Sequence, residues 1–331
     1  MKLFNRRILP LLAALLLACT PLAAFAETEE EDIPLEDLDL TDIDVVTVET
    51  PLVSNPLPID FSPGLAPQES GYLDEYTYKD PTIEVHIEYK DITEYGAMRG
   101  RTAGAWIVDI RIGDASQFRT AAAESFDVDN DWPFEEIAKP MNPVIACNGD
   151  YVTRLKEGFV IRQGTLFRDK LKGHRDVLAV DEDGDFHVFV APKKGELSDT
   201  VDGKKIINAF YFGPILVENG EIPTRKMTTF TYLEEDDYYT RLAICQVGHL
   251  HYKIIATTTK MDKNKTSGLK MKDFARLCLD EGAQIAFNLD GGFSTTLYFR
   301  DEQINTQEHV TNRKLADIIY FASAWDGGAA E

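Results

Sequence analysis

Short apolar runs between polar turns dominate this chain and predict strands. Residues 83–89 alternate between apolar and polar side chains, and residues 106–112 are mostly apolar. Further apolar runs follow, and those between residues 159 and 217 are bounded by turns that contain Gly, as is typical of strands. They cover residues 143–147, 159–162, 177–181, 186–190, 209–212, 216–217, 241–247, 252–258, 283–289, 295–299 and 315–321.

Helical periodicity is rarer than strand alternation. Residues 115–125 and 133–139 predict short helices, and the clearest helix is expected from Ser267, as N-cap, to Gly282, as C′ residue. Strands cluster without regular strand–helix alternation. This pattern predicts an α+β fold, with a single large domain of mixed, mainly antiparallel sheets and a few flanking helices.

The first 26 residues have the pattern of a secretory signal peptide. Basic side chains precede an apolar run that leads to a small-x-small cleavage site, so cleavage after Ala26 predicts a secreted or cell-surface protein. Residues 16–19 also resemble a bacterial lipobox, and a lipoprotein attached through Cys19 is the alternative. No later segment is long and apolar enough to predict a transmembrane helix.

Residues 27–70 predict a disordered, solvated linker. Residues 27–50 contain eleven acidic side chains and no Lys or Arg, and several prolines follow. Such a segment cannot bury enough apolar surface to become ordered. The alternation of aliphatic and acidic side chains leaves open that it adds a strand to a partner. The folded domain is expected over residues 71–325.

The chain is acidic, with a net charge of −22. The remaining chain stays acidic when the expected signal peptide and residues 27–50 are left out. An acidic surface repels nucleic acid and anionic lipid, so neither is an expected partner. A phosphate-bearing substrate would need a locally basic pocket, which makes the arginines near the motifs informative. The sequence does not determine the oligomeric state.

Cysteine usage argues against a disulfide framework. Without the leader, the chain has Cys147, Cys245 and Cys278, an odd number, all within apolar segments. They are expected to be buried thiols. Cys147 precedes a polar motif, but its apolar neighbours disfavour a thiol nucleophile.

Two polar turns follow apolar strands and carry the candidate chemistry. Residues 287–296 place Asp290, two glycines and a hydroxyl run between two expected strands, and residues 148–150 form an Asn-Gly-Asp turn. Glycine permits positive φ and leaves amide groups uncovered for an anion. A plain Asp-Gly hairpin turn is the alternative. The two turns are expected to share one pocket.

Five segments, in this order along the chain, resemble the phosphodiester glycosidase family. They are residues 146–151, 213–220, 240–244, 288–296 and 312–315. The resemblance covers roughly residues 80–321 and implies a hydrolase that cleaves sugar-1-phosphodiester bonds. Two positions depart from the family pattern: Phe293 stands where a third glycine is usual, and Leu242 where Thr or Ser commonly follows Arg241. Phe293 would narrow the pocket or stack on a sugar.

The resemblance and the residue types together suggest roles. Cleavage at an anomeric carbon passes through an oxocarbenium-like state and releases a phosphate, so a carboxylate and a cation must converge. Asp290 and Asp150 are the expected catalytic carboxylates, and Arg241 is the favoured phosphate ligand. The expected substrate-binding residues are Asn148, Gly149, Gly213, Arg241, Asn288, Gly291, Gly292, Ser294, Thr295 and Arg313. As alternatives, Arg241 pairs with the acidic run of residues 234–237, and Arg313 is solvated.

The sequence predicts no metal or other cofactor. Residues 181–185 resemble the start of an EF-hand loop, but Pro192 takes the place of the bidentate Glu. His249 and His251 have strand spacing without an identifiable third ligand. A structural divalent cation at Asp150 remains open.

Two functions of different class remain open. The first is a secreted glycosidase that hydrolyses sugar-1-phosphodiester bonds, of the N-acetylglucosamine kind, in a surface polysaccharide or glycan. The alternative is a non-catalytic carbohydrate- or phosphate-binding module, for which Phe293 is the best argument. The sequence determines neither the natural substrate nor retention or inversion at the anomeric carbon.

Overall fold

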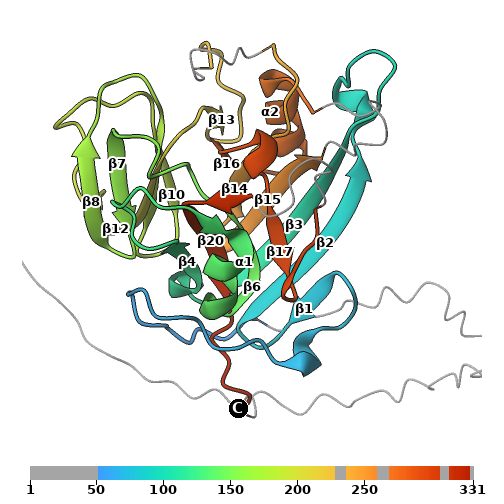
Figure 1. The fold of residues 1–331 in the computed structure, drawn as a ribbon, viewed down its shortest axis with the longest axis vertical. Coiled ribbons are helices and arrows are strands. Elements are labelled where there is room, and N and C mark those ends of the chain that lie inside the picture. The colour runs from blue at the N-terminus through green and yellow to red at the C-terminus, as the bar shows by residue number, and fades with distance from the viewer. Residues whose placement is uncertain (1–50, 228–235, 259–267, 306–312, 329–331) are drawn as a thin grey trace, which may run out of the picture. The chain divides into compact units, whose positions relative to one another are not determined.

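The computed structural model describes residues 51–227, 236–258, 268–305 and 313–328. The expected signal peptide and the acidic run of residues 27–50 lie outside these residues. Strands and a few helices build the body shown in Figure 1, which confirms the α+β prediction. No helix among the described residues is long and apolar enough to cross a membrane.

The strands pair antiparallel in three main sheets of the described chain. The large sheet has the order β1 (Thr77–Lys79), β2 (Ile83–Asp91), β3 (Gly104–Ile112), β15 (His251–Thr258), β14 (Leu242–Gly248), β16 (Ile285–Leu289) and β13 (Ile215–Val217). The second sheet has β10 (Phe186–Phe189), β9 (Val177–Asp181), β12 (Lys204–Tyr211), β7 (Gly158–Arg162) and β8 (Thr165–Lys170), with β11 (Thr200–Val201) beside β12. The third sheet has β18 (Glu302–Gln303), β17 (Leu297–Phe299), β6 (Pro143–Asn148), β20 (Asp317–Ala322) and β4 (Phe118–Ala122), and β19 (Lys314–Leu315) pairs separately with β5 (Trp132–Pro133).

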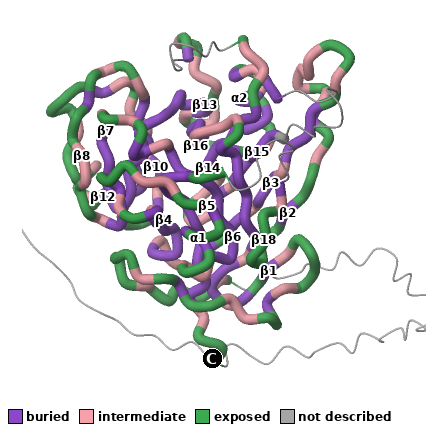
Figure 2. Tube along the Cα trace, in the orientation of Figure 1, coloured by how far each residue is buried: buried purple, intermediate pink, exposed green. Residues whose placement is uncertain are grey.

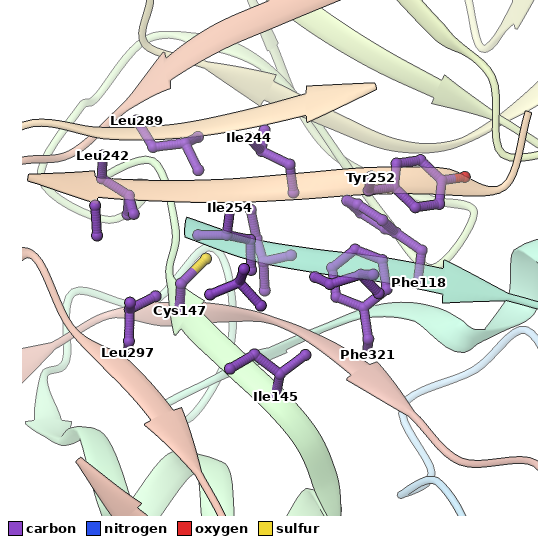
Figure 3. Close-up of a cluster of buried hydrophobic side chains, with 14 of the residues drawn as sticks. Phe118, Ile145, Cys147, Leu242, Ile244, Tyr252, Ile254, Leu289, Leu297 and Phe321 are labelled. Atoms are coloured by element: carbon purple, nitrogen blue, oxygen red, sulfur yellow. The ribbon is translucent and has the colours of Figure 1, made fainter. Parts of the chain in front are cut away.

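The main hydrophobic core lies between the large sheet and the third sheet and also includes side chains of the second sheet. Because successive side chains of a strand point to opposite faces, β14 places Leu242 and Ile244 in this core and Ala243 and Cys245 on the other face. Figure 3 shows Cys147 of β6 among the apolar side chains of this core. Both faces of the central strands are thus buried, which explains their continuous apolar runs.

The two α-helices of the described chain, α1 (Phe134–Ala138) and α2 (Met271–Asp280), cover outer faces of these sheets. Phe274 and Leu277 of α2 pack against the outer face of the large sheet, and Phe134 and Ile137 of α1 pack against the third sheet. Short 3-10 helices complete the body: η3 (Glu69–Gly71), η4 (Thr93–Tyr95), η5 (Ala115–Gln117), η6 (Lys139–Met141) and η7 (Gly292–Ser294). Figure 2 shows the buried positions concentrated in the central strands.

One expected element is wrong, and one alternative is excluded. Residues 115–125 form η5 and then β4 in place of a helix. Both faces of β4 are buried, because Phe118 lies in the main core and Ala121 packs under α1. Residues 283–299 do not form a hairpin, since β16 pairs within the large sheet and β17 pairs with β6 in the third sheet. The turn at Asp290 therefore carries the chain from one sheet to the other.

The ordered body begins before the expected boundary at residue 71. Residues 51–70 contact the sheets, and the buried Arg119 guanidinium donates to the carbonyl oxygens of Pro58, Asp60 and Ser62 at 2.9, 3.0 and 2.9 Å. A disordered linker would make no such contacts. Only residues 27–50 of the predicted linker remain outside the described residues.

Candidate active site

The ends of two strands from different sheets meet at the candidate site. β16 of the large sheet ends at Leu289, and β6 of the third sheet ends at Asn148. The backbone N–H of Asp290 donates to the Gly149 carbonyl oxygen at 3.4 Å, and Asn148 Nδ2 donates to the Asp290 carbonyl oxygen at 2.8 Å. The structure thus brings together the two turns that the sequence placed in one pocket.

Two adjoining hollows form a cleft at this point. The Arg241 lobe has a volume of about 270 Å³ and is lined by Gly213, Arg241, Met271, Asn288 and Phe293, among others. The Asp317 lobe has a volume of about 190 Å³ and is lined by Asp131, Gly149, Arg154, Lys314 and Asp317, among others. Tyr151, Asp290 and Arg313 line both lobes. Asp290 therefore lies where the lobes join.

The Asp290 carboxyl group is withdrawn from water at this junction. Burial raises its pKa to about 6, and the negative charge of Asp150 acts in the same direction. Hydrogen bonds from the Ser294 hydroxyl and the Gly291 amide, and the charge of Arg313, favour the ionised form. Asp290 is thus mostly ionised at neutral pH but can be protonated in a mildly acidic solution.

Asn148 holds the turn that carries Asp290. Its side chain is buried, with Nδ2 donating to the Asp290 and Gly149 carbonyl oxygens and Oδ1 accepting from the Thr296 backbone N–H at 3.0 Å. These bonds connect the end of β6 to both ends of the crossing between the sheets. Asn148 therefore positions Asp290.

Asp150 lies behind the cleft, although the sequence suggested it as a cleft carboxylate. It is 1% exposed and does not line either lobe. Its Oδ1 accepts from Arg162 Nη2 at 2.7 Å, and its Oδ2 accepts from the Tyr211 backbone N–H at 2.7 Å. Both oxygens are thus engaged by the protein. This correction could not be made from the sequence, because β7 and β12 approach Asp150 only in the folded chain.

Asp317, which the sequence analysis did not select, takes the place in the cleft that was expected for Asp150. It is the first residue of β20 and lines the Asp317 lobe with Asp290. Burial raises its pKa to about 7, the charge of Asp150 adds to this, and Arg162 opposes it from 3.4 Å. The local sequence carries no signal for this role, because Asp317 reaches the cleft only through the pairing of β20 with β6.

Gly149 is required beside Asp317. A Cβ atom at residue 149 would lie 2.1 Å from Asp317 Oδ2, which is far inside van der Waals contact. The glycine of the Asn-Gly-Asp turn therefore leaves room for a carboxylate from another strand.

Arg241 lines its lobe with a buried guanidinium. Nε donates to the Leu269 carbonyl oxygen at 3.1 Å, and Nη2 donates to the Asp237 carbonyl oxygen at 2.8 Å. Burial lowers its pKa to about 10, so it remains charged at neutral pH. No ion pair joins Arg241 to a carboxylate within the described residues, and residues 234–235 of the acidic run lie outside them. Leu242, the next residue, is buried in the main core.

Asn288 and Gly213 both line the Arg241 lobe and are bonded to each other. Asn288 Nδ2 donates to the Gly213 carbonyl oxygen at 2.9 Å, and Asn288 Oδ1 is buried without a hydrogen-bond partner among the described residues. A buried acceptor without a partner is unusual in native proteins. A ligand hydroxyl or amide in this lobe would satisfy it.

Gly291, Gly292 and Ser294, which were expected to bind the substrate, use their amide or hydroxyl groups within the protein. The Gly292 amide donates to the Thr240 carbonyl oxygen at 2.8 Å, and the Gly291 amide and the Ser294 hydroxyl bond to Asp290. The turn therefore serves the carboxylate instead of a bound anion. Thr295 is buried outside the two lobes.

The described residues contain no group of three His, Cys, Asp or Glu side chains that could hold a metal ion. His249 and His251, the open metal pair, contact different carboxylates: Nδ1 of His249 lies 3.2 Å from Asp185 Oδ1, and Nε2 of His251 lies 2.9 Å from Asp109 Oδ1. Cys147 is buried in the core, and burial raises the pKa of its thiol.

Comparison with known proteins gives the family. A sequence model of the phosphodiester glycosidase family matches residues 141–322, more than half of the chain. The chain belongs to this family. The match spans both turns and Asp317, so the cleft of this phosphodiester glycosidase family member lies within the shared region. No curated protein matches the chain by sequence.

Solved structures share the fold. The catalytic domain of zebrafish N-acetylglucosamine-1-phosphodiester alpha-N-acetylglucosaminidase, auto-inhibited by its pro-peptide, matches with a TM-score of 0.59 and 17% identity over 74% of this chain and 85% of that domain. A hypothetical protein from Synechocystis matches with a TM-score of 0.50 and 14% identity over 72% of this chain and 62% of that protein. At these identities the matches show that the family fold extends over most of the body.

Proposed function

We propose that this protein hydrolyses sugar-1-phosphodiester bonds of the N-acetylglucosamine-phosphodiester kind in a surface polysaccharide or glycan. The observation that carries the proposal is the pair Asp290 and Asp317, which line one small polar lobe beside a lobe with a buried arginine. Family membership supports a hydrolase, and the name of the zebrafish relative supports the sugar.

The charges of the two lobes suggest how a substrate lies in the cleft. Arg154 and Lys314 line the Asp317 lobe, and Arg313 lines both lobes, whereas the Arg241 lobe also contains apolar side chains such as Met271. We place the phosphate in the Asp317 lobe, next to these cations, and the sugar in the Arg241 lobe. Arg241 then binds sugar oxygens, in contrast to the phosphate role expected from the sequence.

The chemistry follows from the position of Asp290 between the lobes. The bond from the anomeric carbon to the phosphate oxygen breaks, and a water oxygen forms the new bond to this carbon while the water passes a proton to Asp290. Proton exchange with the solvent then restores the ionised Asp290 and the acid form of Asp317. The ionised Asp290 stabilises the positive charge that develops at the anomeric carbon. Asp317, in its acid form, donates its proton to the departing phosphate oxygen, and Arg313 balances the charge of the phosphate. The products are the free sugar and a phosphomonoester.

Asp150 and Arg162 support this arrangement from below. Arg162 is shared by Asp150 and Asp317, so it does not neutralise both carboxylates. Asp150, Asp290 and Asp317 place three carboxylates close together. A proton on Asp317 therefore reduces the repulsion between their negative charges. Asp150 is therefore a positioning residue in this proposal.

Purified protein tests the function with a panel of N-acetylglucosaminyl phosphodiesters, assayed for released phosphomonoester. Turnover that is lost in Asp290→Asn is the expected result. Binding of these compounds without turnover would instead establish the non-catalytic binding module. Lack of both turnover and binding would overturn the proposal for this substrate class.

The amino-terminal pattern supports a secreted or cell-surface location, as part of the proposal. Mass spectrometry of the exported protein measures the new amino terminus. Cleavage after residue 26 supports secretion, and a lipid-modified Cys19 supports a lipoprotein. An uncleaved chain would contradict both.

A further inference from the structure

Beyond Phe293 the cleft continues into a third hollow, which we call the Tyr298 lobe. It has a volume of about 490 Å³ and is lined by Glu135, Phe293, Tyr298, Asp301, Glu302 and Arg313, among others. Phe293 and Arg313 also line the Arg241 lobe, so the two hollows adjoin. The hydrolysis described above uses no other residue of this hollow.

The framework of the Tyr298 lobe is fixed by secondary structure. Tyr298 lies in β17, and its ring packs at 5.7 Å from that of Phe134 at the start of α1. The tight turn between β17 and β18 holds Arg300 and Asp301 at φ values of 51° and 59°. The hollow is therefore built into the fold of the third sheet.

Phe293 forms the boundary between the Arg241 lobe and the Tyr298 lobe. Its side chain is 60% exposed, although its neighbour Ser294 is buried and bonded to Asp290. An exposed aromatic ring on an anchored turn is a feature of binding surfaces. The C–H face of a sugar ring is the natural partner for such a ring in a glycosidase cleft.

Tyr298 presents a buried hydroxyl group to the lobe. The residue is 2% exposed, and its hydroxyl has no hydrogen bond of good geometry within the described residues, although the Asp301 carboxylate interacts with it. Burial raises its pKa, and the charge of Asp301 adds to this effect, so the hydroxyl stays protonated. Buried hydroxyls in native proteins nearly always have a partner. A ligand hydroxyl in the lobe would provide one.

The charges of the lobe select the kind of ligand. Glu135, Asp301 and Glu302 supply carboxylate oxygens, and Arg313 at the boundary is the cation among the residues named for this lobe. Carboxylates accept hydrogen bonds from hydroxyl groups and repel phosphate. The lobe is thus suited to an uncharged, hydroxyl-rich group.

We propose that the Tyr298 lobe binds a second, uncharged sugar residue, joined to the sugar in the Arg241 lobe. Stacking on Phe293 and hydrogen bonds to Tyr298 and the carboxylates hold it. The protein then prefers oligosaccharyl phosphodiesters over a phosphodiester of one sugar. This inference rests on the proposed function, which supplies the occupant of the Arg241 lobe.

The test compares N-acetylglucosaminyl phosphodiester with disaccharyl phosphodiesters that carry a second N-acetylglucosamine in 1→3, 1→4 or 1→6 linkage. At least one disaccharyl substrate is expected to have the higher kcat/KM, by about tenfold for one stacked ring. Phe293→Ala and Tyr298→Phe should each reduce this ratio. Phe61→Ala, which removes another exposed aromatic ring outside the cleft, should keep it.

Separate outcomes distinguish the two proposals. If no disaccharyl substrate exceeds the single-sugar substrate, or if Phe293→Ala keeps the ratio, the second subsite is wrong while the glycosidase function stands. If nothing is hydrolysed, calorimetric binding of neutral N-acetylglucosamine dimers to the wild type and to Phe293→Ala still tests the subsite. Equal affinity of the two proteins, or no binding by either, would then overturn it.

Discussion

Burial decides the charge of individual residues in the cleft. Asp290 and Asp317 both lose water, and both have raised pKa values, whereas Asp150 has each oxygen bonded by the protein. Arg241 keeps a pKa of about 10 despite burial, so it stays charged at neutral pH, and main-chain carbonyl oxygens accept hydrogen bonds from it. The chemistry of the site therefore depends on which side chains the fold leaves open to the lobes.

Asp290→Asn should reduce turnover by about a thousandfold or more, because the amide keeps the shape but loses the charge that stabilises the oxocarbenium-like state. The melting temperature at pH 7.5 should be unchanged or higher. Folding raises the pKa of Asp290 to about 6, so the free energy of unfolding decreases as the pH rises toward this value and Asp290 ionises. Asn does not ionise, and the variant therefore does not lose this free energy.

Kinetics and thermal unfolding of the same preparation check the Asp290 prediction. Asp80→Asn, at a buried carboxylate that does not line the lobes, serves as the matched control for changes in stability. A variant at residue 290 with nearly wild-type turnover would exclude a catalytic Asp290.

The pH dependence of kcat/KM tests Asp317. The rate should rise as Asp290 ionises near its raised pKa of about 6 and fall as Asp317 loses its proton near about 7. Asp317→Asn should lower the maximum by roughly ten- to a hundredfold and remove the fall at high pH, because an amide does not ionise. If the variant keeps that fall, Asp317 is not the proton donor.

Substitutions at the two arginines test the orientation of the substrate. Arg241→Lys keeps the charge but loses the planar fork, so it should weaken binding of the phosphodiester and of the free sugar product by the same factor, about tenfold. Arg313→Gln should weaken the phosphodiester alone. Steady-state KM and product inhibition measure both effects. Unchanged values in Arg241→Lys would remove Arg241 from the site.

At the scale of elements, the sequence predicted strands well where apolar runs are bounded by clear turns. The runs that became β14, β15 and β16 were found, because both faces of these strands are buried. The run at residues 115–125 failed, since Arg119 of β4 is buried by contacts with a distant segment that no local pattern reveals. Sheet membership was equally hidden: the partners of β16 and β17 lie far away in sequence.

Contacts between distant segments, which the sequence does not reveal, also explain which site residues were predicted. The two turns around Asn148 and Asp290 have local signatures, and the structure brings them together. Asp317 has no local signature, because it reaches the cleft only through the pairing of β20 with β6. Asp150 was predicted to lie in the cleft, but Arg162 and the Tyr211 backbone amide bond both of its oxygens behind the cleft.

Gly149→Ala tests the packing between β6 and β20. The added methyl group would lie 2.1 Å from Asp317 Oδ2, so the turn or the carboxylate must move. We expect a loss of about 1–3 kcal/mol in the free energy of unfolding together with lower activity.

Urea unfolding and the phosphodiester assay measure both effects at residue 149. Gly248→Ala is the matched control, since its Cβ would have 4.0 Å to the nearest neighbour, His251 Cβ. Equal free energies of unfolding for the two variants would show that the Asp317 carboxylate can move aside without destabilising the protein.

At the scale of the whole molecule, the segment from residue 51 to residue 70 is part of the body. Figure 1 shows it, in blue, beneath the sheets. Arg119 donates from two guanidinium nitrogens to this segment, and Asn55 Nδ2 bonds to the Ala324 carbonyl oxygen at 2.5 Å. The body therefore includes residues on both sides of the boundary expected at residue 71.

A chain that begins at Gly71 should unfold at a lower temperature than one that begins at Pro51. Without the segment, the buried Arg119 loses the acceptors Pro58, Asp60 and Ser62, and an unpaired buried charge is strongly destabilising. Thermal unfolding of the two chains checks this. Equal midpoints would show that the segment only lies against a body that is complete without it.

The crossing of the chain between two sheets has a consequence for stereochemistry. Asp290 follows a strand of the large sheet and Asp317 begins a strand of the third sheet, so the core between the sheets determines the distance between the two carboxyl groups. In glycosidases, a spacing of about 5–5.5 Å gives retention and about 6.5–9.5 Å gives inversion. A smaller side chain at Ile319, in that core, would thus alter the spacing and the anomer of the released sugar without any change to the lining of the cleft.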